Sequence, residues 1–183
     1  SIPNSLVIIH FHDIIISVLF ERGEFGINEK YQTVTALIAY SIGIPAFIIL
    51  KSCQPAFLAE GDTKTPMYIG IVMLLLNIIL SLILMKYLSH AGIALATSLS
   101  SWIGCIIYII LLFKNKKIQN ISILLIYSIK IFLMSSIMIL VMKLCFYQIS
   151  TFQIHKTVTL FLIIILGLLT YFLTCGFLRY IPQ

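Results

Sequence analysis

The sequence predicts an all-α protein, a bundle of about six helices that span a membrane. Two observations carry this prediction. Hydrophobic residues make up 61% of the 183-residue chain and charged residues only 10%, whereas a soluble domain usually carries about 25% charge. The hydrophobic residues also gather in long stretches, and about 20 mostly apolar residues suffice to cross the hydrocarbon core. One small core cannot bury so much apolar surface, so we expect the surplus to face lipid.

Six such stretches follow one another, separated by short polar segments. They lie at residues 2–20, 33–59, 66–88, 91–113, 121–147 and 157–181. Between the second and the third, Gly61 and Asp62 suit a turn. Thr65 is placed to cap the third helix, with Pro66 at its first helical position. Residues 89–92 suit a tight hairpin between the third helix and the fourth.

The charge pattern disfavours several classes of function. The net charge is +6, but the basic residues are scattered without a basic face of interleaved aromatics, so nucleic-acid binding is not expected. The four cysteines lie singly in apolar stretches, without zinc or C-x-x-C spacing. A membrane-embedded enzyme needs clustered carboxylates or histidines in a water-facing loop. Among the loops that we predict to be cytoplasmic, only the one after the second span contains acids, Glu60 and Asp62. The predicted turn already accounts for these two residues.

The sequence gives weaker signals about how the spans are oriented in the membrane and about whether the chain is part of a longer protein. The total count of Lys and Arg favours neither side of the membrane. The cluster Lys114, Lys116 and Lys117, with Lys130 near it, favours a cytoplasmic side for the loop after residue 113. The chain begins at Ser1 without the basic segment and cleavage site of a signal peptide. We therefore expect a piece of a longer protein.

Polar residues and prolines within the apolar stretches need a reason, because polar groups at membrane depth are costly. Lys51 lies about 12 Å along the axis from the end of its stretch. It either snorkels to the interface or faces a cavity that attracts an anion. Pro45 should kink its helix, as an ordinary bend or as a functional hinge. His10 and Asp13 are three residues apart on one helix face, which predicts a local pair.

Small and polar residues mark the third and fourth stretches. A ladder of small residues, which lets another helix approach closely, recurs every four residues at Gly92, Ala96, Ser100 and Gly104. Asn77, Ser81 and Thr97 would face one another across the predicted hairpin. Their oxygens suit a small hard cation such as Na⁺, and they equally suit hydrogen bonds between helices.

Three segments, occurring in this order, resemble the MurJ (MviN) family of lipid II flippases: LFERGEF at 19–25, ALIAYSIGIPAFIILKSCQPAFLAEGDTKTP at 36–66 and HAGIALATSLSSWIG at 90–104. The resemblance implies a fourteen-helix exporter-type fold, with two six-helix lobes and an additional pair. It assigns residues 1–113 to the last four helices of the second lobe. It assigns residues 114–183 to the additional pair, which forms a groove for the lipid tail.

The resemblance also implies a function. Family members move lipid II, the lipid-linked peptidoglycan precursor, across the bacterial inner membrane by alternating access. Lys51 and Tyr40 are then candidates to line the substrate cavity, with Pro45 as a hinge. The arginines that hold the pyrophosphate belong to earlier helices outside this chain, so the N-terminal half of the same flippase is the expected partner. The alternatives are a related exporter of another lipid-linked sugar or drug, and an inactive remnant.

No cofactor is expected, apart from Na⁺ as a coupling ion. Some family members hold sodium through an Asn and a Thr that match Asn77 and Thr97, with Ile93 placed to offer a backbone carbonyl. Where those members have an acid, this chain has Ser81. A second acid would lie outside the chain, so the resemblance implies an incomplete set of sodium ligands.

Overall fold

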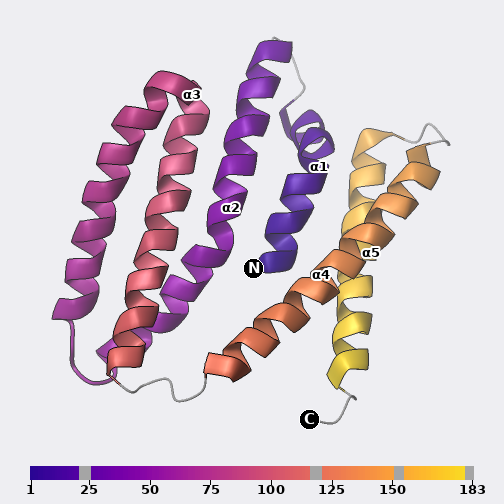
Figure 1. The fold of residues 1–183 in the computed structure, drawn as a ribbon. Coiled ribbons are helices and arrows are strands. Elements are labelled where there is room, and N and C mark those ends of the chain that lie inside the picture. Colours follow the sequence, from indigo (N-terminus) through magenta and orange to yellow (C-terminus); the bar gives the residue numbers. More distant parts are fainter. Residues whose placement is uncertain (21–25, 116–120, 151–154, 180–183) are drawn as a thin grey trace. The chain divides into compact units, whose positions relative to one another are not determined.

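The computed structural model describes residues 1–20, 26–115, 121–150 and 155–179, and these residues are helical outside short connections. The helices are α1 (Ile2–Phe20), α2 (Ile27–Leu58), α3 (Lys64–Lys114), α4 (Ile121–Ser150) and α5 (Lys156–Arg179) (Figure 1). All five are long and apolar enough to cross a membrane. The predicted all-α transmembrane fold is confirmed.

Helix α3 is a hairpin, which reconciles five helices with six predicted spans. Its 51 residues would measure about 76 Å if straight, more than twice the hydrocarbon thickness. Ser89 leaves the helical backbone angles (φ 49°, ψ −126°), and the ribbon folds back on itself (Figure 1). Just beyond the turn, a Cβ on Gly92 would collide with the carbonyl of Leu84. The two arms correspond to the predicted spans 66–88 and 91–113.

The start of α3 corrects the predicted cap. The helix begins one residue before Thr65, and its flanking residue Thr63 makes no side-chain cap. The carboxylate of Asp62 accepts a hydrogen bond from the backbone N–H of Thr65 at 3.0 Å, which satisfies a donor that the first turn leaves open. Thr65 is therefore not the cap, and Pro66 stands at the third helical position. Gly61 adopts φ +74°, which confirms the turn.

The chain forms two compact units. Unit 1 comprises Tyr31–Ile121 together with Ser1, and unit 2 comprises Ile2–Lys30 and Ser122–Gln183. Unit 1 thus holds most of α2 and all of α3, while unit 2 holds α1, α4, α5 and the first residues of α2. These units are defined by contacts within each of them. The division into lobe and additional pair at residue 113 stays a prediction.

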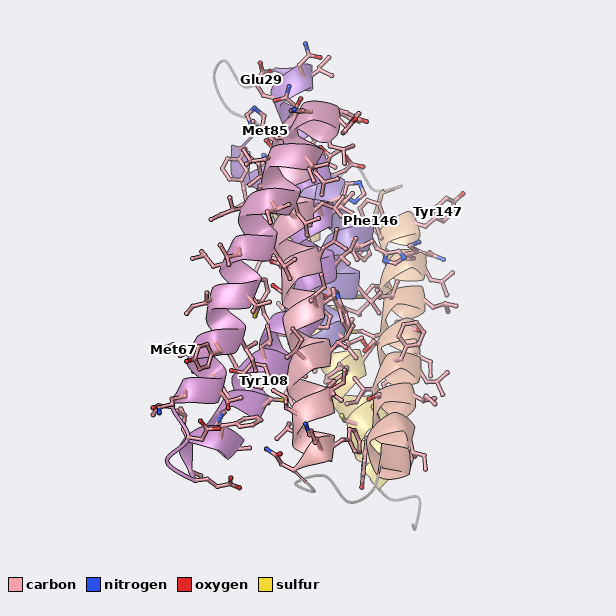
Figure 2. All side chains as sticks on the ribbon, turned by 60° about the vertical axis from the view of Figure 1, so that its left-hand side comes forward. Glu29, Met67, Met85, Tyr108, Phe146 and Tyr147 are labelled. Carbon is pink, nitrogen blue, oxygen red and sulfur yellow. The ribbon has the colours of Figure 1, made fainter. Side chains whose placement is uncertain are left out.

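The core of unit 1 lies between α2 and α3, mainly its second arm, with Ile69 from the first arm. It is built from Ala46, Leu50, Phe57, Ile69, Cys105, Tyr108 and Leu112. Phe57 and Tyr108 meet edge to face, with ring centroids 5.6 Å apart. Apart from Ile69 and Met73, which pack in or against this core, the first arm of α3 leaves most of its large apolar side chains exposed. Met67 and Met85, near its two ends (Figure 2), are 52% and 48% exposed. A face of this kind suits lipid or further protein rather than water.

Small residues bring α2 and α3 into close contact farther along. A Cβ on Gly43 would lie 2.5 Å from Ser98 Oγ and 3.0 Å from Ser98 Cα. Ser98 donates a hydrogen bond to the carbonyl of Ala39 at 2.6 Å, and Trp102 Nε1 donates to the carbonyl of Ile42 at 3.0 Å. The predicted ladder of small residues on α3, at Gly92, Ala96, Ser100 and Gly104, is buried as well. Its two glycines face the first arm of α3 rather than α2, because a Cβ on Gly92 would meet Leu84 and a Cβ on Gly104 would meet Met73.

Unit 2 packs α1 against α4 and α5. Its core consists of Phe11, Met138, Ile139, Met142 and Ile163. Phe11 meets Phe146 edge to face, with ring centroids 5.7 Å apart. Gly167 of α5 lies against the sulfur of Met142, 2.7 Å from where its Cβ would be. Helix α1 is interrupted at Phe11, which departs from helical angles (φ −116°, ψ 19°).

Candidate functional site

The predicted cavity residues of unit 1 lie along α2. Tyr40 is 46% exposed and Lys51 is also exposed. They are 11 residues apart, close to three full helical turns, so they share one face about 16 Å apart along the axis. Lys51 has no ion-pair or hydrogen-bond partner among the described residues. The opposite face of α2 is buried against α3. Tyr40 and Lys51 thus form an outward face that is available to ligand, lipid or further helices.

Pro45 lies half-buried within α2, between those two residues along the chain. The helix continues through Pro45 and Pro55, and its axis curves over its C-terminal half (Figure 1). A proline removes one backbone bond and disturbs the carbonyl four residues before it. In this chain the hydrogen bonds from Ser98 and Trp102 reach carbonyls in the preceding turns. A hinge role for Pro45 stays a prediction.

The four predicted sodium ligands form two separate local pairs. Ser81 donates a hydrogen bond to Asn77 Oδ1 at 3.1 Å, and Thr97 donates to the carbonyl of Ile93 at 3.0 Å. Among the described residues, no hydrogen bond joins one pair to the other. Local bonds of this kind satisfy the polar groups without an ion. A sodium site stays a prediction, and it would need ligands from elsewhere.

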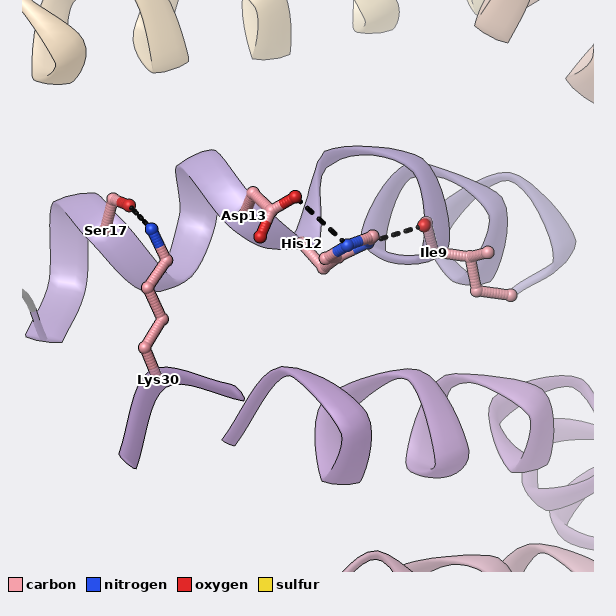
Figure 3. Close-up of polar contacts among 5 residues, drawn as sticks. All are labelled: Ile9, His12, Asp13, Ser17 and Lys30. Carbon is pink, nitrogen blue, oxygen red and sulfur yellow. Dashed lines mark hydrogen bonds and ion pairs between the residues drawn. The ribbon is translucent and has the colours of Figure 1, made fainter. Parts of the chain in front are cut away.

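The polar residues of α1 pair differently from the prediction. His12 Nε2 lies 3.3 Å from Asp13 Oδ2 and His12 Nδ1 lies 2.8 Å from the carbonyl of Ile9 (Figure 3). His10 instead bonds to the carbonyl of Leu6 at 2.9 Å. The predicted pairing of His10 with Asp13 is therefore wrong. Residues three apart share a face only in a regular helix, and the break at Phe11 lies between them.

A hollow of about 400 Å³ lies at one end of unit 2, beside this pair. It is lined by Asp13, Ile14, Ser17, Lys30, Phe146, Lys156 and Thr159. Four elements contribute, because the C-terminal parts of α1 and α4 meet the N-terminal parts of α2 and α5. Ser17 and Thr159 are buried, at 9% and 6% exposure. Lys30 reaches across from α2 and donates a hydrogen bond to Ser17 Oγ at 2.7 Å (Figure 3).

Sequence reasoning missed this hollow. Asp13 and Ser17 stand four residues apart on one face of α1, which is a visible signal. Lys30 and Lys156 lie in two predicted loops, after the first span and before the last, on the same predicted side of the membrane, and this is a second signal. Their convergence depends on how α1, α4 and α5 pack, and hydropathy carries no information on that.

A second hollow in unit 2, of about 420 Å³, runs between α1 and α4. Most of its lining is apolar, and the residues are Leu6, His10, Phe132, Ser136, Ile139, Leu140, Lys143 and Leu144. Lys143 contributes an ammonium group and His10 an imidazole. Such a trough suits a hydrocarbon chain better than a polar solute.

Some sequence features that the predictions used lie outside the described residues. They are the segment ERGEF at 21–25 and the lysines Lys116 and Lys117. Lys130, counted with that cluster, is described, and its ammonium lies 5.9 Å from the ring centroid of Tyr127. The described residues also hold no group of three or more His, Cys, Asp or Glu side chains that could bind a metal ion.

Comparison with known proteins gives a consistent result. The family model for the lipid II flippase MurJ matches residues 1–168. A probable lipid II flippase MurJ of Buchnera aphidicola subsp. Acyrthosiphon pisum is 31% identical over 165 residues, which are 88% of this chain and 32% of that protein. One from Rickettsia prowazekii is 39% identical over 102 residues, which are 56% of this chain and 20% of that protein.

A solved structure gives the same match in three dimensions. A lipid II flippase MurJ in an inward closed conformation is 32% identical and superposes with a TM-score of 0.78, covering 97% of this chain and 35% of that chain. The chain thus spans about a fifth to a third of the length of these relatives.

Proposed function

We propose, from the premise that the chain belongs to the MurJ lipid II flippase family, that it supplies the C-terminal helices of a flippase for lipid II. In this proposal the chain is a fragment of the working transporter. The N-terminal half of the same flippase would supply the rest of the cavity. The complete protein would carry the lipid-linked peptidoglycan precursor across the membrane by alternating access.

The observation that carries the proposal is the likeness in both sequence and structure over nearly the whole chain. At 32% identity and a TM-score of 0.78 over 97% of its residues, the chain has the helices and connections of part of a flippase. Its membrane-spanning helices and its family make it a multi-pass protein of the bacterial inner membrane. The family is one of transporters, not of enzymes.

Two features of the units support specific roles. The outward face of α2 with Tyr40 and Lys51 is suited to complete a cavity whose other wall comes from outside the chain. Lys51 would attract the pyrophosphate of the substrate there. The apolar trough between α1 and α4 has the lining and volume to hold part of a lipid tail.

A chimera tests the proposal. The segment of an intact MurJ relative that aligns with this chain is replaced by residues 1–183, in cells whose own flippase can be depleted. Rescue of growth and of lipid II export supports the proposal. The control is the same relative with the segment deleted, with membrane insertion of each protein checked through a C-terminal tag. An inserted chimera that leaves lipid II trapped on the inner leaflet would favour an inactive remnant or an exporter of another substrate.

A further inference from the structure

The hollow at the end of unit 2 contains donors on Lys30 and Ser17 beyond those that the described hydrogen bonds use. The Lys30 ammonium has three N–H donors and gives one of them to Ser17. Ser17 Oγ accepts that bond, and its own O–H has no acceptor among the described residues. Ser17 is 9% exposed, so this donor is held inside the hollow. Lys156 adds a second ammonium to the lining.

The charges of the hollow favour an anion. Two lysines and one carboxylate, Asp13, line it. Asp13 lies 3.3 Å from His12 Nε2. The two ammonium groups outnumber the single carboxylate in the described lining, and this balance favours an anion.

The position and the apolar lining point to a lipid rather than a free ion. Ser17 is three residues from the end of α1, and Lys30 and Thr159 are each three residues from the start of their helices. At 1.5 Å per residue these groups lie within about 5 Å of the helix ends, at the level of lipid headgroups. Ile14 and Phe146 form an apolar part of the same lining, which suits the first carbons of an acyl chain.

We propose that this hollow binds the phosphate of an anionic phospholipid, with Lys30 and Lys156 as its cationic contacts and Ser17 as a hydroxyl donor. Lysine suits a phosphate as a point charge, and a lysine near an anionic surface strengthens binding by about fivefold. The site uses unit 2 alone. It is separate from the α2 face proposed for lipid II, so it stands whether or not the flippase proposal holds.

The test measures lipid binding to the purified full chain in neutral detergent. Phosphatidylglycerol, phosphatidylcholine and inorganic phosphate are added in turn, and native mass spectrometry and thermal unfolding record bound lipid and stabilisation. We expect binding and stabilisation by phosphatidylglycerol, and little by the zwitterionic lipid or inorganic phosphate. Equal effects of the two lipids would overturn the proposal. Saturation of the site by inorganic phosphate alone would make it a free-anion site and refute the lipid assignment.

Variants then locate the site. The double variant Lys30→Gln/Lys156→Gln should weaken phosphatidylglycerol binding by about 30-fold, from about fivefold for each lysine. The matched control Lys130→Gln removes a lysine of α4 that does not line the hollow and should leave binding unchanged. If the double variant does not fold, each single variant and Ser17→Ala are measured instead. If folded variants of Lys30 and Lys156 bind phosphatidylglycerol with unchanged affinity, the lipid binds elsewhere and the proposal is refuted.

Discussion

Replacement of Gly43 by alanine measures how tightly α2 packs on α3. The added Cβ would stand 2.5 Å from Ser98 Oγ and 3.0 Å from Ser98 Cα. The hydroxyl can turn aside only by giving up its 2.6 Å hydrogen bond to Ala39. The Cα belongs to the backbone of α3 and can move only with that helix. Relief therefore requires a lost hydrogen bond, a displaced helix or both.

Three effects decide the sign of the Gly43→Ala change. Alanine is favoured over glycine in a helix interior by about 1 kcal/mol. Overpacking costs about 1–3 kcal/mol, and we take about 2 because one of the clashing atoms is backbone. The lost hydrogen bond to Ala39 costs about 1 kcal/mol more. The free energy of unfolding should thus fall by about 2 kcal/mol in total.

Trp102 provides a fluorescent probe of the α2–α3 contact, and Gly70 provides a matched control for the Gly43 variant. Trp102 is the single tryptophan and donates to Ile42 across the same contact, so its fluorescence during SDS titration in micelles follows the separation of α2 from α3. Gly70 of α3 has no atom within 4 Å of its Cβ position. Gly70→Ala should therefore keep or raise stability, by up to about 1 kcal/mol. Equal shifts for the two glycine variants would refute the packing argument.

Further predictions concern the candidate cavity and the hairpin. In the chimeric flippase, Lys51→Ala should reduce lipid II export while leaving the unfolding temperature within a degree or two, since Lys51 is exposed and has no described partner; normal complementation would exclude a cavity role. Pro45→Ala should slow export while circular dichroism shows an unchanged helix content, and an unchanged export rate would make Pro45 an ordinary bend. Gly92→Ala should destabilise the α3 hairpin by about 1–3 kcal/mol, because its Cβ collides with the backbone of Leu84; a neutral shift in SDS titration would contradict this.

Hydropathy predicted the spans well, because lipid requires long apolar helices. The first span, 2–20, coincides with α1, and the predicted hairpin falls at the observed turn at Ser89. Helix α2 begins at Ile27, six residues before the predicted start at 33. Its first turns carry polar residues that extend the helix past the apolar stretch. Helix ends follow backbone hydrogen bonds and capping, which hydropathy does not report.

The polar contacts were harder to predict, because they depend on local breaks and on packing between helices. The pairing of Asp13 failed because Phe11 interrupts the regular spacing that the prediction assumed. Asn77, Ser81 and Thr97 were predicted to face one another, but their hydrogen bonds among the described residues stay within each arm, from Ser81 to Asn77 and from Thr97 to Ile93. By contrast, the buried bond from Ser98 to Ala39 joins residues 59 apart in sequence. The ladder of small residues did not predict it, because its glycines face the first arm of α3 instead of α2.

The contact between α2 and α3 limits how a flippase containing this chain can move. Gly43 allows no extra methylene at that point, and the hydrogen bonds from Ser98 and Trp102 tie the backbone of α2 to α3. Packed interfaces of this kind shift as bodies rather than stretch. We therefore expect α2 and α3 to move together in the proposed alternating-access cycle. The outward face with Tyr40 and Lys51 would then move with them, and the change in access would arise where that face meets the helices supplied from outside the chain.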